Sequence, residues 1–144
     1  MPKPDPALLD PERYLFTCRI EPRFSDLDVN LHINNVAMAA FLEEAHIRFH
    51  RVNGYRQGIT GGLTTMVASV TIEYLGQGSY PAPIDVHLAI ERVGRTSHEM
   101  VKLVTQEGAP IAFSRTVMVT VGADGPAPNP TGFTQTAAEW TLRP

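Results

Sequence analysis

A polar turn just ahead of a long helix carries the groups in this sequence that are best suited to chemistry. The turn holds carboxylate, amide and imidazole side chains: Asp26, Asp28, Asn30, His32, Asn34 and Asn35. A helix follows directly, and its N-terminus presents unpaired backbone N–H groups and a partial positive charge. Carboxylates and an imidazole beside such an end could polarise a carbonyl group and activate a water molecule. The turn is therefore the predicted active site.

Local signals set the limits of this helix. Asn34 is a good N-cap, and Asn53–Gly54 is a typical stop signal, so the helix is predicted to run to about Val52. Residues 36–42 are apolar all round, which favours a buried helix over one laid on a surface. Farther along, only one stripe stays apolar, formed by Ala45, Phe49 and Val52.

Alternating apolar and polar residues predict strands on both sides of the helix. Short connections at Gly94 and Gly108 favour antiparallel hairpins. One long helix beside several antiparallel strands predicts an α+β fold, in which a curled sheet of about five strands wraps the helix. The expected strand segments are 14–21, 63–74, 84–90, 96–105 and 111–121.

The alternation also predicts which side chains share a face. One face of the 63–74 strand should hold Met66, Ala68, Val70, Ile72 and Tyr74. In the last strand, one face should hold Ile111, Phe113, Val117, Val119 and Val121, and Arg115 interrupts it and needs a partner.

The two ends of the chain are predicted to add little to the fold. Four prolines within residues 1–11 indicate an extended tail. The Gly- and Pro-rich run 122–132 is typical of a linker, and a short terminal helix should follow it with the capping box Thr136-x-x-Glu139. Residues 1–144 are then one domain.

Composition limits the function classes. The net charge of −3 offers no basic face for nucleic acid, and no apolar run approaches the ~20 residues of a membrane span. The N-terminus lacks the apolar stretch of a signal peptide. The single cysteine, Cys18, is expected to be a small buried strand residue and suits a reducing cytosol. These features predict a cytoplasmic protein.

The motif resembles that of the hotdog-fold acyl thioesterases. The run from Asp26 to Asn35, followed by the Phe-Leu-Glu-Glu-Ala run of residues 41–45, is similar to both the 4-hydroxybenzoyl-CoA thioesterase type and the acyl-ACP thioesterases. The order of elements agrees over residues 14–121. The resemblance implies a hotdog fold and a hydrolase that cleaves an acyl-CoA or acyl-ACP thioester to free acid and thiol, in fatty acid metabolism.

The resemblance also implies residue roles. Asp28 matches the catalytic carboxylate, acting as general base or nucleophile, with Asn30 and His32 working beside it. The backbone N–H of Asn35 matches the amide that polarises the thioester carbonyl. The family's sites lie at dimer interfaces, which implies a homodimer or a dimer of dimers (a homotetramer). A helix in the concave side of a sheet leaves little interior volume, so a seam between two subunits is expected on physical grounds as well.

Other residues are expected to bind the substrate. Met38 stands where many members have a tyrosine and should border the acyl pocket. Arg95, beside Thr96 and Ser97, suits a phosphate of coenzyme A. No metal or separate cofactor is expected, because coenzyme A or phosphopantetheine is part of the substrate. The chain departs from the family pattern at Leu31, where many members have glycine.

Several alternatives stay open. A hotdog hydratase or dehydratase also uses Asp, Asn and His, but its motif has one residue more than Asp28-x-Asn30-x-His32. A non-catalytic module that binds acyl thioesters is a third class. Asp28 could be only a turn cap, and Glu43 or Glu44 could be the catalytic acid instead. His46 and His50 have a metal-ligand spacing, but surface helix histidines are favoured.

Overall fold

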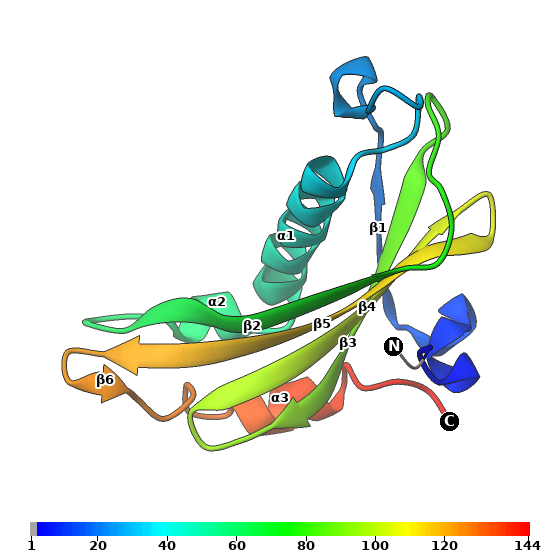
Figure 1. Cartoon of the computed structure of the whole chain (residues 1–144). Helices are drawn as coiled ribbons and strands as arrows, with labels where there is room; N and C mark the ends of the chain where they lie inside the picture. The colour runs from blue at the N-terminus through cyan, green and yellow to red at the C-terminus, as the bar shows by residue number, and fades with distance from the viewer. Residues whose placement is uncertain (1–2) are drawn as a thin grey trace.

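The computed structural model describes residues 3–144 as one curled antiparallel sheet around a long helix (Figure 1). The sheet has the strand order β1-β3-β4-β5-β2, and β6 pairs with β5. In chain order the elements are η1 (Pro6–Leu9), η2 (Pro11–Arg13), β1 (Phe16–Ile20), η3 (Phe24–Asp26), α1 (Asn35–Val52), α2 (Tyr55–Gly58), β2 (Thr64–Tyr74), β3 (Ile84–Val93), β4 (Ser97–Gln106), β5 (Ala109–Gly122), β6 (Gly125–Pro126) and α3 (Phe133–Ala138).

The limits predicted for α1 are confirmed. The Asn34 side chain accepts a hydrogen bond from the Ala37 N–H at 2.7 Å, as expected of an N-cap. Asn53 is the C-cap, and Gly54 adopts a φ of +86° in the left-handed region. The chain can therefore turn sharply at Gly54 and start α2.

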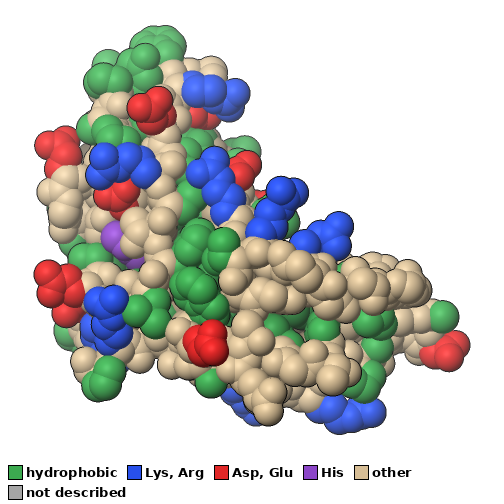
Figure 2. Space-filling model, turned by 180° about the vertical axis from the view of Figure 1, so that it is seen from behind, with side chains coloured by type: hydrophobic (Ala, Val, Ile, Leu, Met, Phe, Trp, Pro, Cys, Tyr) green, Lys and Arg blue, Asp and Glu red, His purple; other side chains and the backbone are tan. Residues whose placement is uncertain are grey.

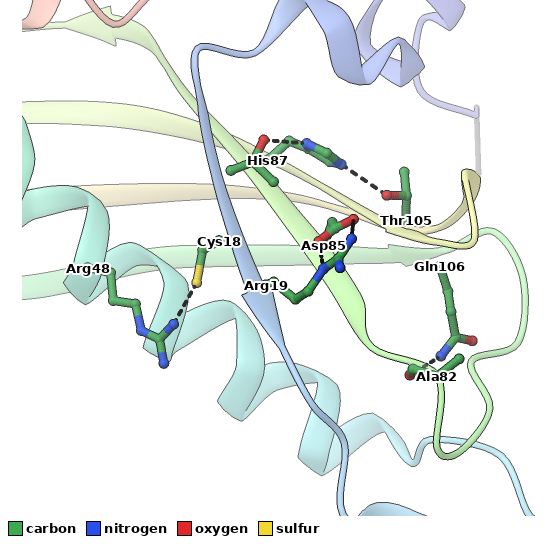
Figure 3. Close-up of polar contacts among 9 residues, drawn as sticks. Cys18, Arg19, Arg48, Ala82, Asp85, His87, Thr105 and Gln106 are labelled. Carbon is green, nitrogen blue, oxygen red and sulfur yellow. Dashed lines mark hydrogen bonds and ion pairs between the residues drawn. The ribbon is translucent and has the colours of Figure 1, made fainter.

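One side of α1 packs into the concave face of the sheet. Phe41, Leu42, Ala45 and Phe49 are buried in the main core cluster together with the apolar side chains of β3 and β4. Cys18 of β1 is buried as predicted, and Arg48 of α1 donates a hydrogen bond to its sulfur at 3.2 Å (Figure 3).

The other side of the first half of α1 is open, so the prediction of burial all round is wrong for the single chain. Val36 is 76% exposed, and Ala39 and Ala40 are exposed as well. Strand β2 lies at the edge of the sheet, and Val67 and Val70 on it are also exposed. An open apolar helix face beside an open sheet edge is typical of a surface that a partner covers.

A β-bulge in β2 changes the predicted face pattern. The pairing with β5 shifts between Val67 and Ser69, so Ala68 is the extra residue. Val67 and Val70 therefore share the helix-side face with Ile72, whereas Met66 lies on the opposite face. Strict alternation along the sequence puts Met66 on the same face as Val70. The one-residue bulge lies between them and reverses the faces, so the two side chains lie on opposite sides of the sheet.

The predicted apolar face of β5 is also split. Ile111 belongs to the core cluster beneath α1, but Phe113 belongs to a second cluster on the outer face of the sheet. Ser114 and Thr116 are buried on the helix side. Arg115 lies on the outer face and forms an ion pair with Glu91 at 2.7 Å, which supplies the partner it needs.

The two ends of the chain cover the outer face of the sheet. Leu8, Leu9 and Leu142 pack against the second cluster, and the Tyr14 hydroxyl donates a hydrogen bond to the Leu8 carbonyl at 2.7 Å. Residues 3–11, expected to be extended, instead contain η1 and the start of η2, while residues 1 and 2 of that predicted tail lie outside the described residues. The Arg143 N–H donates to the Arg13 carbonyl at 2.8 Å, so both ends meet.

The short terminal helix is present as α3, but its predicted capping box is wrong. Gly132 is the N-cap, with a φ of +83°, and Thr136 lies inside the helix. The Thr136 hydroxyl donates back to the Gly132 carbonyl at 3.2 Å, and Glu139 is the C-cap. The predicted linker is held to the sheet by β6 and by the Asn129 side chain, which donates to the Gly94 carbonyl at 2.9 Å.

Candidate active site

Asp28 lies in the turn before α1, with its side chain exposed in the single chain. Its Oδ1 accepts hydrogen bonds from the backbone N–H groups of Asn30 (2.8 Å) and His32 (3.3 Å). The other carboxylate oxygen, Oδ2, makes no hydrogen bond to residues 3–144. Asp28 thus shapes the turn with one oxygen and leaves the second available.

Asp26 has a structural role in the turn. Arg23 forms an ion pair with the Asp26 carboxylate at 3.0 Å, and the Arg23 N–H donates to the same carboxylate at 2.7 Å. The hydrogen bond from the Arg23 side chain lowers the pKa of Asp26. The Asp26 carbonyl accepts the Asn34 N–H at 2.8 Å, which fixes the approach to α1.

The turn is attached to the connection between β2 and β3 through Gly78. The Ile33 N–H donates to the Gly78 carbonyl at 2.9 Å. A Cβ atom on Gly78 would lie 2.7 Å from Cδ1 of Ile33, so glycine allows this close approach. The Gln106 side chain donates to the carbonyls of Ser79 (2.9 Å) and Ala82 (2.8 Å) and so holds the same loop at the end of β4 (Figure 3).

Leu31 occupies the left-handed region of backbone conformation, with a φ of +62°. The family pattern has glycine at this position, and the conformation gives the physical reason, because a side chain there costs about 1 kcal/mol. The leucine side chain is 64% exposed, so little burial offsets this cost.

Substitutions at Leu31 should therefore show how much the backbone strain at this position lowers the stability of the protein. We expect Leu31→Gly to leave the free energy of unfolding unchanged or raise it by about 0.5 kcal/mol, since relief of strain offsets the greater chain entropy of glycine. Leu31→Val should lower it by about 1 kcal/mol or more, because a β-branched side chain suits this conformation worst. Urea denaturation of the three proteins gives the order, and a less stable glycine variant would contradict the strain argument.

The remaining predicted site residues gather at the same end of α1. Asn30 is exposed and His32 is half-buried, and neither side chain hydrogen-bonds to residues 3–144. Asn35 is the first residue of α1, where a backbone N–H has no partner within the helix. Met38, expected to border the acyl pocket, is buried in the main core cluster.

Hydrophobic side chains are exposed around this turn. Figure 2 shows them gathered at the top of the molecule, where η3 and the connection between β2 and β3 lie. An exposed apolar patch of this kind is typical of a binding or subunit interface. The exposed residues are Phe24, Val29, Leu31, Val36 and Tyr80.

Arg95, Thr96 and Ser97 lie at the other end of the sheet, in the turn between β3 and β4 (Figure 1). Strand β3 alone has ten residues, so about 30 Å of strand separates this turn from the loop beside Asp28. A single chain therefore does not bring the predicted phosphate-binding residues to the predicted catalytic turn.

A trough runs between α1 and β2 and begins one helical turn beyond Asn35. Its first cavity measures about 230 Å³ and a second, toward α2, about 490 Å³, with His46 bordering both. We call these two cavities the α1–β2 trough. The first is lined by apolar side chains and four polar ones: Ala39, Leu42, Val67, Val70 and Ile72, with Glu43, His46, Lys102 and Thr116.

Glu43 and Glu44 separate in the structure. Glu44 is paired with Arg48 at 2.8 Å on the exposed face of α1. Glu43 is exposed and lines the first cavity of the trough. Of the two glutamates, Glu43 is thus the one that borders the trough.

The expectation that His46 and His50 lie on the helix surface is wrong, because they are only 3% and 4% exposed. Nε2 of His50 lies 2.9 Å from Nε2 of His98, so one of these rings donates its proton to the other. Burial lowers the pKa of His46 to about 3, that of His50 to about 2 and that of His98 to about 4. The three rings are neutral at neutral pH. No group of three or more His, Cys, Asp or Glu among residues 3–144 is arranged to hold a metal ion.

Lys102 is the functional candidate that sequence reasoning missed. It is 2% exposed and lies on the helix side of β4, where its Nζ donates to the Leu42 carbonyl (3.3 Å) and to Nδ1 of His46 (3.2 Å). No carboxylate among residues 3–144 forms an ion pair with it. Burial lowers its pKa to about 8, so the ammonium form still dominates at pH 7.

A buried ammonium without an anion should cost the fold stability. We expect Lys102→Met to raise the free energy of unfolding at pH 7 by roughly 2–3 kcal/mol, from a pKa lowered by more than two units. The sign follows from the linkage between proton binding and folding. A lowered lysine pKa favours the folded state only above the pKa of the unfolded chain, about 10.5, and this contribution to stability is lost as the pH falls through the pKa of the folded protein, about 8. Denaturant titrations at pH 7 and pH 10 test this, because the advantage of methionine should shrink at pH 10.

Comparison with known proteins decides the family. Residues 22–139 match the model of the thioesterase-like superfamily. The chain belongs to this superfamily. A search of curated proteins finds no match.

Solved structures agree with the superfamily assignment and show the hotdog fold. A thioesterase from Thermus thermophilus, complexed with coenzyme A and Zn, has 28% identity and a TM-score of 0.77, covering 89% of this chain and 95% of its own. A predicted thioesterase from Bacillus stearothermophilus has 26% identity and a TM-score of 0.76, covering 90% and 98%. A Pseudomonas aeruginosa protein has 26% identity and a TM-score of 0.79, covering 91% and 94%. None of the helices among residues 3–144 is long and apolar enough to cross a membrane.

Proposed function

We propose that this member of the thioesterase-like superfamily hydrolyses acyl-CoA thioesters to a free acid and coenzyme A. What supports the proposal is the carboxylate of Asp28 and the imidazole of His32 in the turn before the open N-terminus of α1, together with an apolar trough that begins one helical turn farther along this helix. The relative from Thermus thermophilus, crystallised with coenzyme A, supports this carrier over acyl-ACP.

The proposed reaction uses the turn before α1. The free Oδ2 of Asp28 either deprotonates a water molecule that attacks the thioester carbon, or attacks that carbon itself to give a mixed anhydride that water then hydrolyses. In both routes the C–S bond breaks and coenzyme A leaves as the thiol. Negative charge then develops on the thioester oxygen, and the backbone N–H of Asn35 stabilises it. Asn30 orients the water, and His32 supports the carboxylate or donates a hydrogen bond to the leaving sulfur.

A second copy of this chain would complete the site. The open side of α1, the edge strand β2 and the apolar patch around Asp28 form one exposed surface on the single chain. We propose that two chains pair along it as a homodimer, alone or within a tetramer. The turn with Arg95 lies too far from Asp28 of its own chain, so its proposed phosphate contact would serve the partner's site.

The deciding experiment measures turnover on a panel of thioesters. Purified protein should release free thiol from at least one acyl- or aryl-CoA, detected with a thiol reagent, and acyl-ACP substrates should be slower. Hydration of an enoyl-CoA without thiol release would favour the hydratase, and tight binding without turnover would favour a binding module. Either result would overturn the proposed hydrolysis.

A further inference from the structure

We infer that the acyl group of the preferred substrate ends in a carboxylate, which Lys102 binds inside the α1–β2 trough. This inference rests on the proposed function and specifies its substrate class. It is carried by the surroundings of Lys102, whose buried positive charge lines a cavity and forms no ion pair with a carboxylate among residues 3–144.

The cation is held in a fixed position that points it toward the trough. Two of its three donors are used, by the Leu42 carbonyl and by Nδ1 of His46. Both acceptors are neutral, because the buried His46 ring is not protonated at neutral pH. One donor and the whole charge remain available, and a buried charge is stable only when it is paired.

Two further hydrogen-bonding groups lie on β5, the strand that pairs with the strand of Lys102. The hydroxyls of Ser114 and Thr116 are buried and make no hydrogen bond to residues 3–144. Ser114 is the cross-strand partner of Lys102, and Thr116 lines the same cavity. A carboxylate has two oxygens with several acceptor positions, so it can take a proton from Lys102 and from a hydroxyl at once.

The rest of the cavity is built for an aliphatic chain. Apolar side chains of α1 and β2 line it, led by Ala39, Leu42 and Val70. Glu43 also lines it, but this residue is exposed, and it forms none of the ion pairs among residues 3–144. Its charge raises the pKa of Lys102 and so keeps the ammonium protonated for the ligand.

The length of α1 sets the length of the acyl group. Asn35, beside the proposed thioester carbonyl, and Leu42, beside Nζ, are seven residues apart, which is about 10 Å along a helix. A half-thioester of a medium-length dicarboxylic acid spans this distance. Adipyl-CoA and suberyl-CoA are therefore the probes, and hexanoyl-CoA and octanoyl-CoA are their uncharged counterparts of equal chain length.

The test compares selectivity, taken as the ratio of kcat/KM for suberyl-CoA to that for octanoyl-CoA. We expect this ratio to exceed about 10 in the unchanged protein and to fall about 100-fold in Lys102→Met, since a site built around a charged group rejects a substrate whose partner is missing. Arg19→Met removes a cation from the outer face of β1, far from the trough, and should keep the ratio. Equal kcat/KM values for the two substrates, or an unchanged ratio in Lys102→Met, would overturn the inference.

A binding measurement separates this inference from the proposed hydrolysis. Suberate alone should raise the thermal unfolding temperature of the unchanged protein, octanoate should not, and Lys102→Met should abolish the suberate effect. If octanoyl-CoA is hydrolysed but suberate has no effect, the carboxylate site is wrong and the thioesterase stands. If suberate stabilises the protein but no thioester is cleaved, the hydrolysis is wrong and the carboxylate site stands.

Thr116→Val is a smaller change in the same cavity and replaces Lys102→Met if that variant does not fold. It should also lower the ratio of kcat/KM for suberyl-CoA to that for octanoyl-CoA.

Discussion

Replacing Asp28 with asparagine is expected to lower kcat/KM for acyl-CoA hydrolysis by about 10³-fold, within the range for loss of a general base. Asparagine keeps an oxygen that can accept the N–H groups of Asn30 and His32, so the turn should keep its shape. It removes the negative charge and the basic oxygen that face solvent. Steady-state assays of thiol release, with thermal unfolding of both proteins as the folding check, measure the effect.

Glu43→Gln provides the contrast, because Glu43 is the carboxylate that lines the trough. If Asp28 is the catalytic group, Glu43→Gln should cost no more than about tenfold, an effect of charge on substrate binding rather than on chemistry. A large loss in Glu43→Gln together with a small loss in Asp28→Asn would move the catalytic role to α1. Asp28 would then be only the cap of its turn.

Acid should unfold the protein steeply, beginning below about pH 6.5. His46, His50 and His98 are buried and neutral, with pKa values lowered to about 3, 2 and 4, while in the unfolded chain they titrate near 6.5. Groups with lowered pKa values contribute stability above the unfolded value and lose it as pH falls. Three protons bound only by the unfolded chain give a slope of about 4 kcal/mol per pH unit, so we expect unfolding between about pH 5 and pH 3.

The slope of the free energy of unfolding against pH, rather than the midpoint of acid unfolding, tests the role of the buried histidines. The double change His50→Phe and His98→Phe removes the hydrogen-bonded pair together and leaves neither ring unpaired. It should lower the slope by about 2.7 kcal/mol per pH unit, because two proton-binding groups are removed, while His46 and His87, whose pKa values are also lowered by burial, remain. Leu31→Gly, which changes no titratable group, is the control, and its slope should equal that of the unchanged protein. Circular dichroism of urea unfolding at half-unit steps of pH gives the slopes. Equal slopes in all three proteins would show that the buried rings do not control acid stability.

The first and last residues of α1 could be predicted because the signals that set them are local. Asn34 caps the first turn with its own side chain, and Asn53–Gly54 ends the last turn through a conformation that glycine adopts easily. The turn before the helix was equally clear, since closely spaced polar residues must meet there. Long-range structure adds only the attachment at Gly78.

The interior of the trough could not be predicted because it depends on tertiary contacts. Lys102 stands in a strand whose alternation is weak, and nothing nearby in sequence shows that the carbonyl of Leu42 lies above it. His46 and His50 fall outside the stripe of Ala45 and Phe49, yet they are buried, because a neutral imidazole with a partner can enter a core. Their partners, Lys102 and His98, stand in β4 and are far from the helix in the sequence, so no local pattern predicts these contacts.

The meeting of the two chain ends has a practical consequence. Arg13 and Arg143 bind each other's backbone on the outer face of the sheet, so the described parts of the two terminal segments lie side by side. A short linker could join them, and the backbone could be reopened at the exposed turn between β5 and β6. Such a circular permutant would place affinity tags or fusion partners at the tip of the sheet without cutting the segment that carries Asp28.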